Sequence, residues 1–271
     1  MSRMGTLELP DGASLRFDEA GDGPAVVLLH PGLWDRRTWD EQMTSFPAAG
    51  YRTIRYDQRG YGGSSRLSGE PYSRVEDLVA VLDHLEVDRA ALVGVSMGGT
   101  LAIDATLDRP DRVWALVPCA ADPSGFEPLR EEEDWWESSG EPIEAAIEAG
   151  DLDQAEELRL QIWAPLGTDD PAGATIRRIA FDNIHEMTMD ESSAIELDPP
   201  AVVRLGEIDV PTLVLIAEHD PPFMRRAGEL LAREIIDARS VVIEGADHVI
   251  NVRQPEAFEE AVLPFLDGVR P

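Results

Sequence analysis

The sequence predicts an α/β fold, in which a mostly parallel sheet of about eight strands carries helices on both faces and a helical lid is inserted. Continuous apolar runs, such as residues 25–29 and 90–93, are typical of strands buried on both faces of a parallel sheet. Amphipathic stretches, such as residues 74–85 with apolar side chains at helical spacing, alternate with these runs. This alternation of strands and helices favours an open parallel sheet over a sandwich or a helical bundle.

The elements can be assigned in order along the chain. Residues 6–9 and 13–17 alternate between apolar and polar around a Pro-Asp-Gly turn, which predicts an antiparallel hairpin. A short helix is expected at 35–43, and a longer one directly after Gly98. Further strands are expected at 25–29, 51–56, 90–93, 112–117, 210–217 and 240–243, and further helices at 74–85, 228–236 and 255–266.

The stretch from residue 125 to residue 203 differs in character from the rest of the chain. It is strongly acidic, contains Trp135, Trp136 and Trp163, and shows no convincing strand. Because core strands resume only afterwards, we expect an inserted lid, with its tryptophans either lining the underside or packing inside. Helical patterns lie at 142–149, 152–163 and 174–187, and the chain divides into core residues 1–124, lid residues 125–203 and core residues 204–271.

Composition narrows the class of protein. A formal net charge of −30 in 271 residues argues against nucleic acid as a partner, because phosphate binding needs a basic patch. No apolar run approaches the ~20 residues of a membrane span, and residues 1–10 lack a basic-then-apolar signal, so we expect a cytoplasmic protein without membrane contact. The lone cysteine, Cys119, excludes an internal disulfide and is expected to be a buried hydrophobe. The oligomeric state does not follow from the sequence.

The main candidate for chemistry is the G-x-S-x-G motif at residues 94–98. The preceding apolar run ends at Gly94 and a helical pattern starts after Gly98, so the turn between them is tight. Such a turn strains its central residue, exposes the Ser96 hydroxyl and leaves room only for very small residues two positions away on each side. The helix start adds unpaired N–H groups and the positive end of a dipole, which suit a developing oxyanion. Ser96 is therefore predicted to be a nucleophile.

A serine nucleophile needs a base, and the base needs an acid that fixes its tautomer. His248 is the predicted base, because it follows the last strand on a loop that can reach back over the serine. The other four histidines fit less well: His30 comes too early, His84 lies within a helix, His185 lies in the lid, and His219 points away from Asp220.

The acid has two candidates. Asp220 and Asp122 each follow an expected core strand, and both leave the sheet at the edge where Ser96 lies. Asp247 is adjacent to His248 and therefore too close in sequence to fold back onto Nδ1. The chain order serine, acid, histidine favours Asp220, and Asp122 remains the alternative.

These motifs together resemble the α/β-hydrolase superfamily, in its branch of esterases, enol-lactonases and perhydrolases, over residues 6–267. The resemblance implies the α/β-hydrolase fold, no cofactor and no metal. The serine at the turn argues against dehalogenases and epoxide hydrolases, which use aspartate there. The segments that carry the resemblance are His-Pro-Gly at 30–32, Asp-Gln-Arg-Gly-Tyr-Gly at 57–62, Gly-Val-Ser-Met-Gly at 94–98, Glu-His-Asp at 218–220 and Gly-Ala-Asp-His at 245–248.

One departure from the family concerns the oxyanion hole. The loop usually reads His-Gly where this chain has Pro31, and proline has no N–H to donate. The oxyanion donor besides Met97 is therefore either Gly32 or Leu33, and the sequence does not decide between them.

The leading functional hypothesis is a serine hydrolase that cleaves a small carboxylic ester or lactone through an acyl-enzyme on Ser96. The alternatives are a carbon–carbon bond hydrolase of a dienoate, which would use the same triad, and a ligand receptor that lost turnover. The expected partner in each case is a small molecule.

Two charge patterns complete the expectations. Asp57 and Arg59 are expected to form an ion pair that stabilises their loop. The net charge of −30, with acidic runs in the lid, predicts that neutral esters are preferred over anionic ones. Arg159, Arg177 and Arg178 of the lid are the residues that would oppose this preference by forming a local anion site.

Overall fold

The computed structural model describes residues 3–271, apart from the side chains of Glu131, Glu133 and Trp136. The strands are β1 (Arg3–Glu8), β2 (Ser14–Ala20), β3 (Ala25–Leu29), β4 (Arg52–Tyr56), β5 (Ala90–Val95), β6 (Val113–Cys119), β7 (Leu213–Ala217) and β8 (Arg239–Ile243). The helices are α1 (Gln42–Ala48), α2 (Arg74–His84), α3 (Met97–Asp108), α4 (Arg130–Glu148), α5 (Leu152–Trp163), α6 (Pro171–Asp182), α7 (Pro222–Glu234), α8 (Ile250–Arg253) and α9 (Pro255–Val269), with short 3₁₀ helices η1 (Arg36–Trp39), η2 (Pro110–Arg112), η3 (Ile184–Thr188), η4 (Ala201–Val203) and η5 (Leu205–Glu207).

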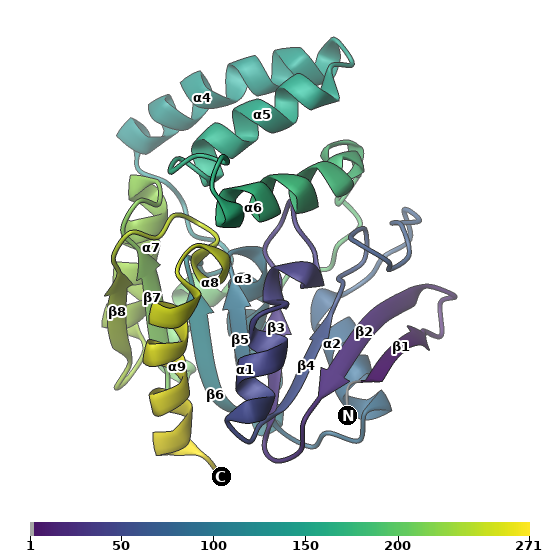
Figure 1. Ribbon diagram of the computed structural model, residues 1–271, viewed down its shortest axis with the longest axis vertical. Coiled ribbons are helices and arrows are strands. Elements are labelled where there is room, and N and C mark those ends of the chain that lie inside the picture. Colours follow the sequence, from purple (N-terminus) through teal and green to yellow (C-terminus); the bar gives the residue numbers. More distant parts are fainter. Residues whose placement is uncertain (1–2) are drawn as a thin grey trace.

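Within residues 3–271, eight strands form one sheet in the order β1-β2-β4-β3-β5-β6-β7-β8 (Figure 1). β2 pairs antiparallel with β1 and β4, while every other neighbouring pair is parallel. All residues of β3, β5, β6 and β7 are buried, as the apolar runs indicate. The predicted α/β fold with a mostly parallel sheet of about eight strands is confirmed.

Helices cover both faces of the sheet. On one face, Leu82 of α2, Ile103 of α3 and Leu231 of α7 belong to one apolar cluster with the sheet. On the other face, Phe46 of α1 and Phe258 of α9 belong to a second cluster. Figure 1 shows α1 and α9 in front of the sheet, with α2 and α3 behind it. The lone cysteine is fully buried in the second cluster, as predicted.

The helices α4, α5 and α6 lie together above the carboxyl ends of the parallel strands (Figure 1). Trp34, from the loop after β3, packs with Leu160 of α5 and Ile176 of α6 in a third apolar cluster. Its indole N–H also donates to the carbonyl oxygen of Ile176 at 2.8 Å. Arg253 of α8 adds a hydrogen bond to the carbonyl oxygen of Gly167 at 2.9 Å. These contacts dock the helices over the edge of the sheet that carries the site.

Three helices begin earlier than the sequence pattern indicates. α4 starts at Arg130 instead of residue 142, and it keeps Pro142 in its interior. α6 starts at Pro171, where the Asp170 side chain caps it by accepting a backbone N–H at 2.6 Å. α7 starts at Pro222. Proline costs no helical hydrogen bond in the first turn, so α6 and α7 can begin at their prolines, ahead of the starts expected at residues 174 and 228.

Among residues 3–271, none of the helices combines the length and apolar character needed to cross a bilayer. The expected cytoplasmic location and the absence of nucleic-acid partners stay predictions.

Candidate active site

The turn between β5 and α3 holds Ser96 in a strained conformation. Its φ of 52° and ψ of −122° lie where residues other than glycine are rare. A Cβ at Gly94 would lie 2.1 Å from the carbonyl oxygen of Gly98, and a Cβ at Gly98 would lie 2.2 Å from that of Leu29. Only glycine fits at these two positions, as the spacing predicts. The turn therefore packs closely against the end of β3, and Ser96 is partly exposed at the tip of the turn.

Two further contacts fix this turn. The Ser96 N–H donates to the carbonyl oxygen of Cys119 in β6 at 2.9 Å. Gly99 lies so close to the loop after β6 that a Cβ there would be 2.4 Å from the Cβ of Ala121. Sequence reasoning missed this requirement, because the two segments meet only in the fold. The adjacent glycines at 98 and 99 are the signal that could have found it.

His248 and Asp220 are hydrogen-bonded to each other at the ends of β8 and β7. His248 Nδ1 lies 2.8 Å from Asp220 Oδ1, and both side chains are almost completely buried. Because a carboxylate only accepts, Nδ1 carries the proton, and the Nε2 lone pair is left to act as a base.

Among the described residues, Asp220 is the one hydrogen-bond partner of the His248 ring, so the Ser96 hydroxyl is not bonded to that ring in this structure. Such contacts are often long in free enzymes and tighten when substrate binds.

The other two candidate acids have different surroundings. The Asp247 carboxylate is bound by the Arg253 guanidinium, with Nη2 and Oδ2 2.7 Å apart. Asp122 lies in the loop after β6, where its Oδ1 is 3.4 Å from the Thr100 hydroxyl. Burial raises the pKa of Asp122, and the positive charge available on His248 partly opposes this rise. Asp122 therefore lies within electrostatic reach of His248 but does not hold its ring.

His30 supports the loop after β3, where both of its ring nitrogens are hydrogen-bonded. Its Nε2 accepts the backbone N–H of Gln58 at 2.9 Å, so Nδ1 carries the proton and donates to the carbonyl oxygen of Pro31 at 2.8 Å. Complete burial lowers the pKa of His30, which keeps the ring neutral. The remaining histidines have other contacts: His84 packs against Phe17, His185 donates to Gly60, and His219 is exposed beside Glu218.

The same loop is expected to supply an oxyanion donor. His30 Nδ1 donates to the carbonyl oxygen of Pro31. In a trans peptide, the N–H of the next residue, Gly32, points in the opposite direction from this carbonyl oxygen. A Cβ at Gly32 would lie 4.0 Å from Met97 Sδ, so this loop adjoins the start of α3. Leu33 follows with a positive φ of 67°. The loop residues and Met97 thus come together as expected, and the choice between Gly32 and Leu33 stays open.

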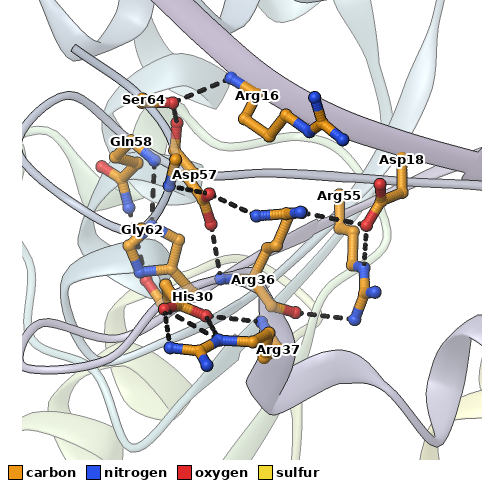
Figure 2. A network of polar contacts seen from close by, with 12 residues as sticks. Arg16, Asp18, His30, Arg36, Arg37, Arg55, Asp57, Gln58, Gly62 and Ser64 are labelled. Atoms are coloured by element: carbon orange, nitrogen blue, oxygen red, sulfur yellow. Dashed lines mark hydrogen bonds and ion pairs between the residues drawn. The ribbon is translucent and has the colours of Figure 1, made fainter. Parts of the chain in front are cut away.

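The ion pair expected between Asp57 and Arg59 is wrong in its partners. Asp57 is completely buried and faces Arg36, whose backbone N–H and guanidinium both bind its carboxylate (Figure 2). The chain turns at residues 59–60, which sends the two side chains to different neighbours. Both residues still serve to hold the loop, as expected. Arg59 binds the carboxylates of Asp11 and Asp77.

Two cavities meet at Ser96. The smaller, of about 240 Å³, lies between the loop after β6, α5 and α7. The larger, of about 660 Å³, runs along α3 between α2 and residues 195–198. Ser96 and Asp122 line both cavities, so a carbonyl group placed at Ser96 can extend into either. The smaller cavity is mainly apolar, with Phe126, Pro128, Trp163, Phe223 and Met224 beside Glu132.

The helix α5 contributes Trp163 to this site. Its ring centroid lies 4.3 Å from that of His248, and it also lines the smaller cavity. Phe223 of α7 has ring centroids 6.2 Å from Trp163 and 6.1 Å from Trp135. Trp163 therefore lies on the underside of the helical block, whereas the side chain of Trp136 is outside the described part of the chain.

The three arginines that the sequence suggested for an anion site are all opposed by carboxylates. Arg159 pairs with Glu156 and Glu186, Arg177 pairs with Glu157, and Arg178 faces Asp182 at 3.9 Å. Neither cavity at Ser96 has any of the three in its lining.

Within the described residues, no group of three or more histidine, cysteine, aspartate or glutamate side chains is arranged to hold a metal ion. The expectation that the site uses neither metal nor cofactor stays a prediction.

Residues 26–261 match the family model described as the alpha/beta hydrolase family. The chain belongs to this family. Among related proteins, 3-oxoadipate enol-lactonase 2 of Acinetobacter baylyi is 29% identical over 248 residues, which cover 89% of this chain and 88% of that protein. An epoxide hydrolase of Caballeronia sordidicola is 40% identical over 131 residues, which cover only 45% of this chain and 40% of that protein.

Solved structures of this alpha/beta hydrolase family extend the likeness to the whole chain. A hydrolase from Pseudomonas aeruginosa PA01 has a TM-score of 0.77 at 30% identity, over 97% of this chain and 98% of that one. Est816, an N-acyl homoserine lactone degrading enzyme, has a TM-score of 0.75 at 27% identity, over 96% of this chain and 100% of that one. The resemblance predicted from the motifs is confirmed, and the protein is a hydrolase of this family.

Proposed function

We propose that this protein is a serine hydrolase that cleaves small carboxylic esters or lactones through an acyl-enzyme on Ser96. The observation that carries the proposal is the 2.8 Å contact between His248 Nδ1 and Asp220 Oδ1, at the same edge of the sheet as a strained, partly exposed serine. A buried carboxylate that fixes the imidazole tautomer is what a serine nucleophile requires of its base.

The proposed reaction uses this geometry in two half-reactions. Ser96 Oγ attacks the substrate carbonyl while His248 Nε2 takes its proton, and Asp220 stabilises the imidazolium that forms. The N–H of Met97, together with that of Gly32 or Leu33, holds the oxyanion. Collapse of the intermediate breaks the carbon–oxygen bond, and the leaving alkoxide takes the proton from His248. Water then attacks the acyl-enzyme with His248 again as base, which releases the acid and restores Ser96.

Two observations support a small ester or lactone as substrate. The smaller cavity at Ser96 has room for only a compact apolar group, at about 240 Å³. Two of the similar proteins, the enol-lactonase and Est816, are named for lactone substrates. In the same proposal, residues 125–203 form the lid, and its residue Trp163 sets the shape of the pocket over His248.

The test is turnover of a panel of p-nitrophenyl esters, neutral lactones and dienoates by the wild type and by Ser96→Ala. The variant should lose a factor on the order of 10⁴ to 10⁶ in kcat on the ester or lactone that the wild type prefers. Ser68→Ala, an exposed serine outside both cavities, is the matched control and should keep full activity.

Circular dichroism should show the same fold in all three proteins. Full activity in Ser96→Ala would contradict the mechanism. A preference for dienoates would favour carbon–carbon bond hydrolysis, and binding without turnover would favour a receptor.

A further inference from the structure

The larger cavity at Ser96 is lined by carboxylates. It runs along α3, whose residues Thr100, Leu101 and Asp104 form one wall. Arg74 is the single basic residue in its lining, and it is already paired with Glu191 at 2.7 Å. The acidic residues of the lining, called here the acidic cavity set, are Glu76, Asp104, Asp108, Asp122, Glu196 and Asp198.

Most of this acidic charge is not held in an ion pair. Arg204 lies within electrostatic range of Asp104 and Asp108, but it is already paired with Glu207 at 2.9 Å. Arg109, outside the lining, pairs with Glu76 and Asp108. The other four members of the acidic cavity set form no ion pair with any residue that the structure describes. In a cleft with low-dielectric walls, uncompensated charge of one sign concentrates ions of the opposite sign.

Within the acidic cavity set, Asp104 is the member whose burial is hardest to explain by packing alone. It is only 9% exposed, and its Oδ1 accepts the Ser124 hydroxyl at 2.7 Å. Its Oδ2 accepts no hydrogen bond from the described residues, although the side chain lines the cavity. A buried carboxylate without a cation is costly unless something else pairs with it.

The pKa of Asp104 reflects its burial among other carboxylates. Burial raises this pKa to about 6, against the opposing hydrogen bond from Ser124. The nearby charges of Glu196, Asp122 and Asp108 raise it further.

Asp122 connects this acidic wall to the reaction. It lines both cavities next to Ser96, and its carboxylate receives a long contact from the Thr100 hydroxyl and a hydrogen bond from its own backbone N–H. A group bonded to a carbonyl at Ser96 therefore passes Asp122 before it reaches Asp104 deeper along α3.

We propose that the preferred substrate carries a positive charge, with its ammonium group in the acidic cavity beside Asp122 and Asp104 and its apolar part in the smaller cavity. The proposal rests on the proposed function of Ser96 and extends it to the substrate class. It assigns Asp122 and Asp104 as specificity-determining residues that touch the substrate without taking part in bond making.

The test compares substrates that differ only in charge. Butyrylcholine and 3,3-dimethylbutyl butyrate have nearly the same shape, with a trimethylammonium group in one and a tert-butyl group in the other. A second pair, p-nitrophenyl 4-(trimethylammonio)butanoate and p-nitrophenyl 5,5-dimethylhexanoate, places the charge on the acyl side. In at least one pair, the cation should have a kcat/KM on the order of tenfold higher at low salt, and added salt should reduce this ratio.

Variants of the cavity should remove the preference selectively. Asp104→Asn and Asp122→Asn should each lower the cation-to-neutral ratio several-fold, mainly through KM for the cation. Asp88→Asn makes the same charge change on an exposed residue before β5, at the opposite end of that strand from Ser96, and should leave the ratio unchanged.

The ratio also depends on pH in a predictable direction. It should fall as pH drops through about 6, because Asp104 becomes protonated and loses its negative charge.

The neutral esters separate this inference from the proposed function. If the wild type does not cleave any neutral ester or lactone, the proposed function is wrong. If it cleaves them but shows no cation preference in either pair, or if the preference survives both cavity variants, the inference is overturned.

Discussion

Replacing Asp104 with asparagine should stabilise the protein at neutral pH. Burial raises the pKa of Asp104 from 3.8 to about 6, so the folded protein holds this proton more tightly than the unfolded chain does. For a carboxyl group whose pKa is raised on folding, ionisation destabilises the folded state, and the full penalty is present above the folded pKa. The penalty shrinks as pH falls from 6 and vanishes below 3.8, where both states are protonated.

The size of the effect follows from this shift. A shift of roughly two pKa units, at about 1.36 kcal/mol each, corresponds to about 3 kcal/mol at pH 7.5. Asparagine keeps a carbonyl oxygen that can accept the Ser124 hydroxyl, so little hydrogen bonding is lost. With an unfolding entropy of roughly 2.1 cal/mol/K per residue over 271 residues, the expected increase in Tm is about 5 °C.

The assay is thermal unfolding of the wild type and Asp104→Asn, followed by calorimetry at pH 7.5, 5 and 3.5. The Tm difference should be largest at pH 7.5, smaller at pH 5 and close to zero at pH 3.5. Asp88→Asn provides the same change at an exposed site and should show no such trend. A variant that is less stable than the wild type at pH 7.5, or a difference that does not change with pH, would refute the reasoning.

Three further predictions concern the site. On a neutral ester, Asp220→Asn should lower kcat by a factor of ~10⁴, because Asp220 is hydrogen-bonded to His248. Asp122→Asn should lower kcat far less, because Asp122 is not bonded to His248, and equal losses in the two variants would reopen the choice of acid. Gly98→Ala should abolish activity or folding, because its Cβ would lie 2.2 Å from the Leu29 carbonyl oxygen. Gly268→Ala, an exposed position in α9 with no neighbouring atom in the way and no positive φ, should keep activity; an active Gly98→Ala would show that the turn tolerates a side chain. An ester bearing a carboxylate should have a lower kcat/KM than its neutral analogue at 0.01 M salt, where the Debye length is ~30 Å, and its kcat/KM should recover as salt is added. An anion favoured at low salt would show that Arg74, which is paired with Glu191, still offers enough positive charge to attract it.

The parts of the site that could be predicted are those set by short-range geometry. The turn at Ser96 needs glycine on both sides because backbone atoms lie within 2.2 Å of the missing Cβ positions. The spacing of the two glycines around the serine in the sequence therefore predicts this turn. Asp220 and His248 could be placed because each follows a strand of the parallel part of the sheet, and the carboxyl ends of parallel strands share one edge.

Other features depend on contacts between distant segments. The pairing of Asp57 with Arg36 joins loops that are far apart in the sequence, so the nearer Arg59 was the natural but wrong partner. The start of α4 at Arg130 was missed because Pro142 was read as a boundary. The acidic cavity lies between α3 and residues 195–198. These two segments are far apart along the chain, so no local sequence pattern predicts that they come together.

The most direct measurement is to trap the acyl-enzyme. The protein is mixed with a p-nitrophenyl ester whose acyl group is removed slowly, and the reaction is quenched with acid. The protein is then digested, and the mass of the peptide that contains Ser96 is measured by mass spectrometry. The mechanism predicts that one acyl group is added to this peptide in the wild type, in step with a burst of p-nitrophenol, and that Ser96→Ala shows neither. A burst with the acyl group on another residue, or steady turnover in Ser96→Ala, would contradict it.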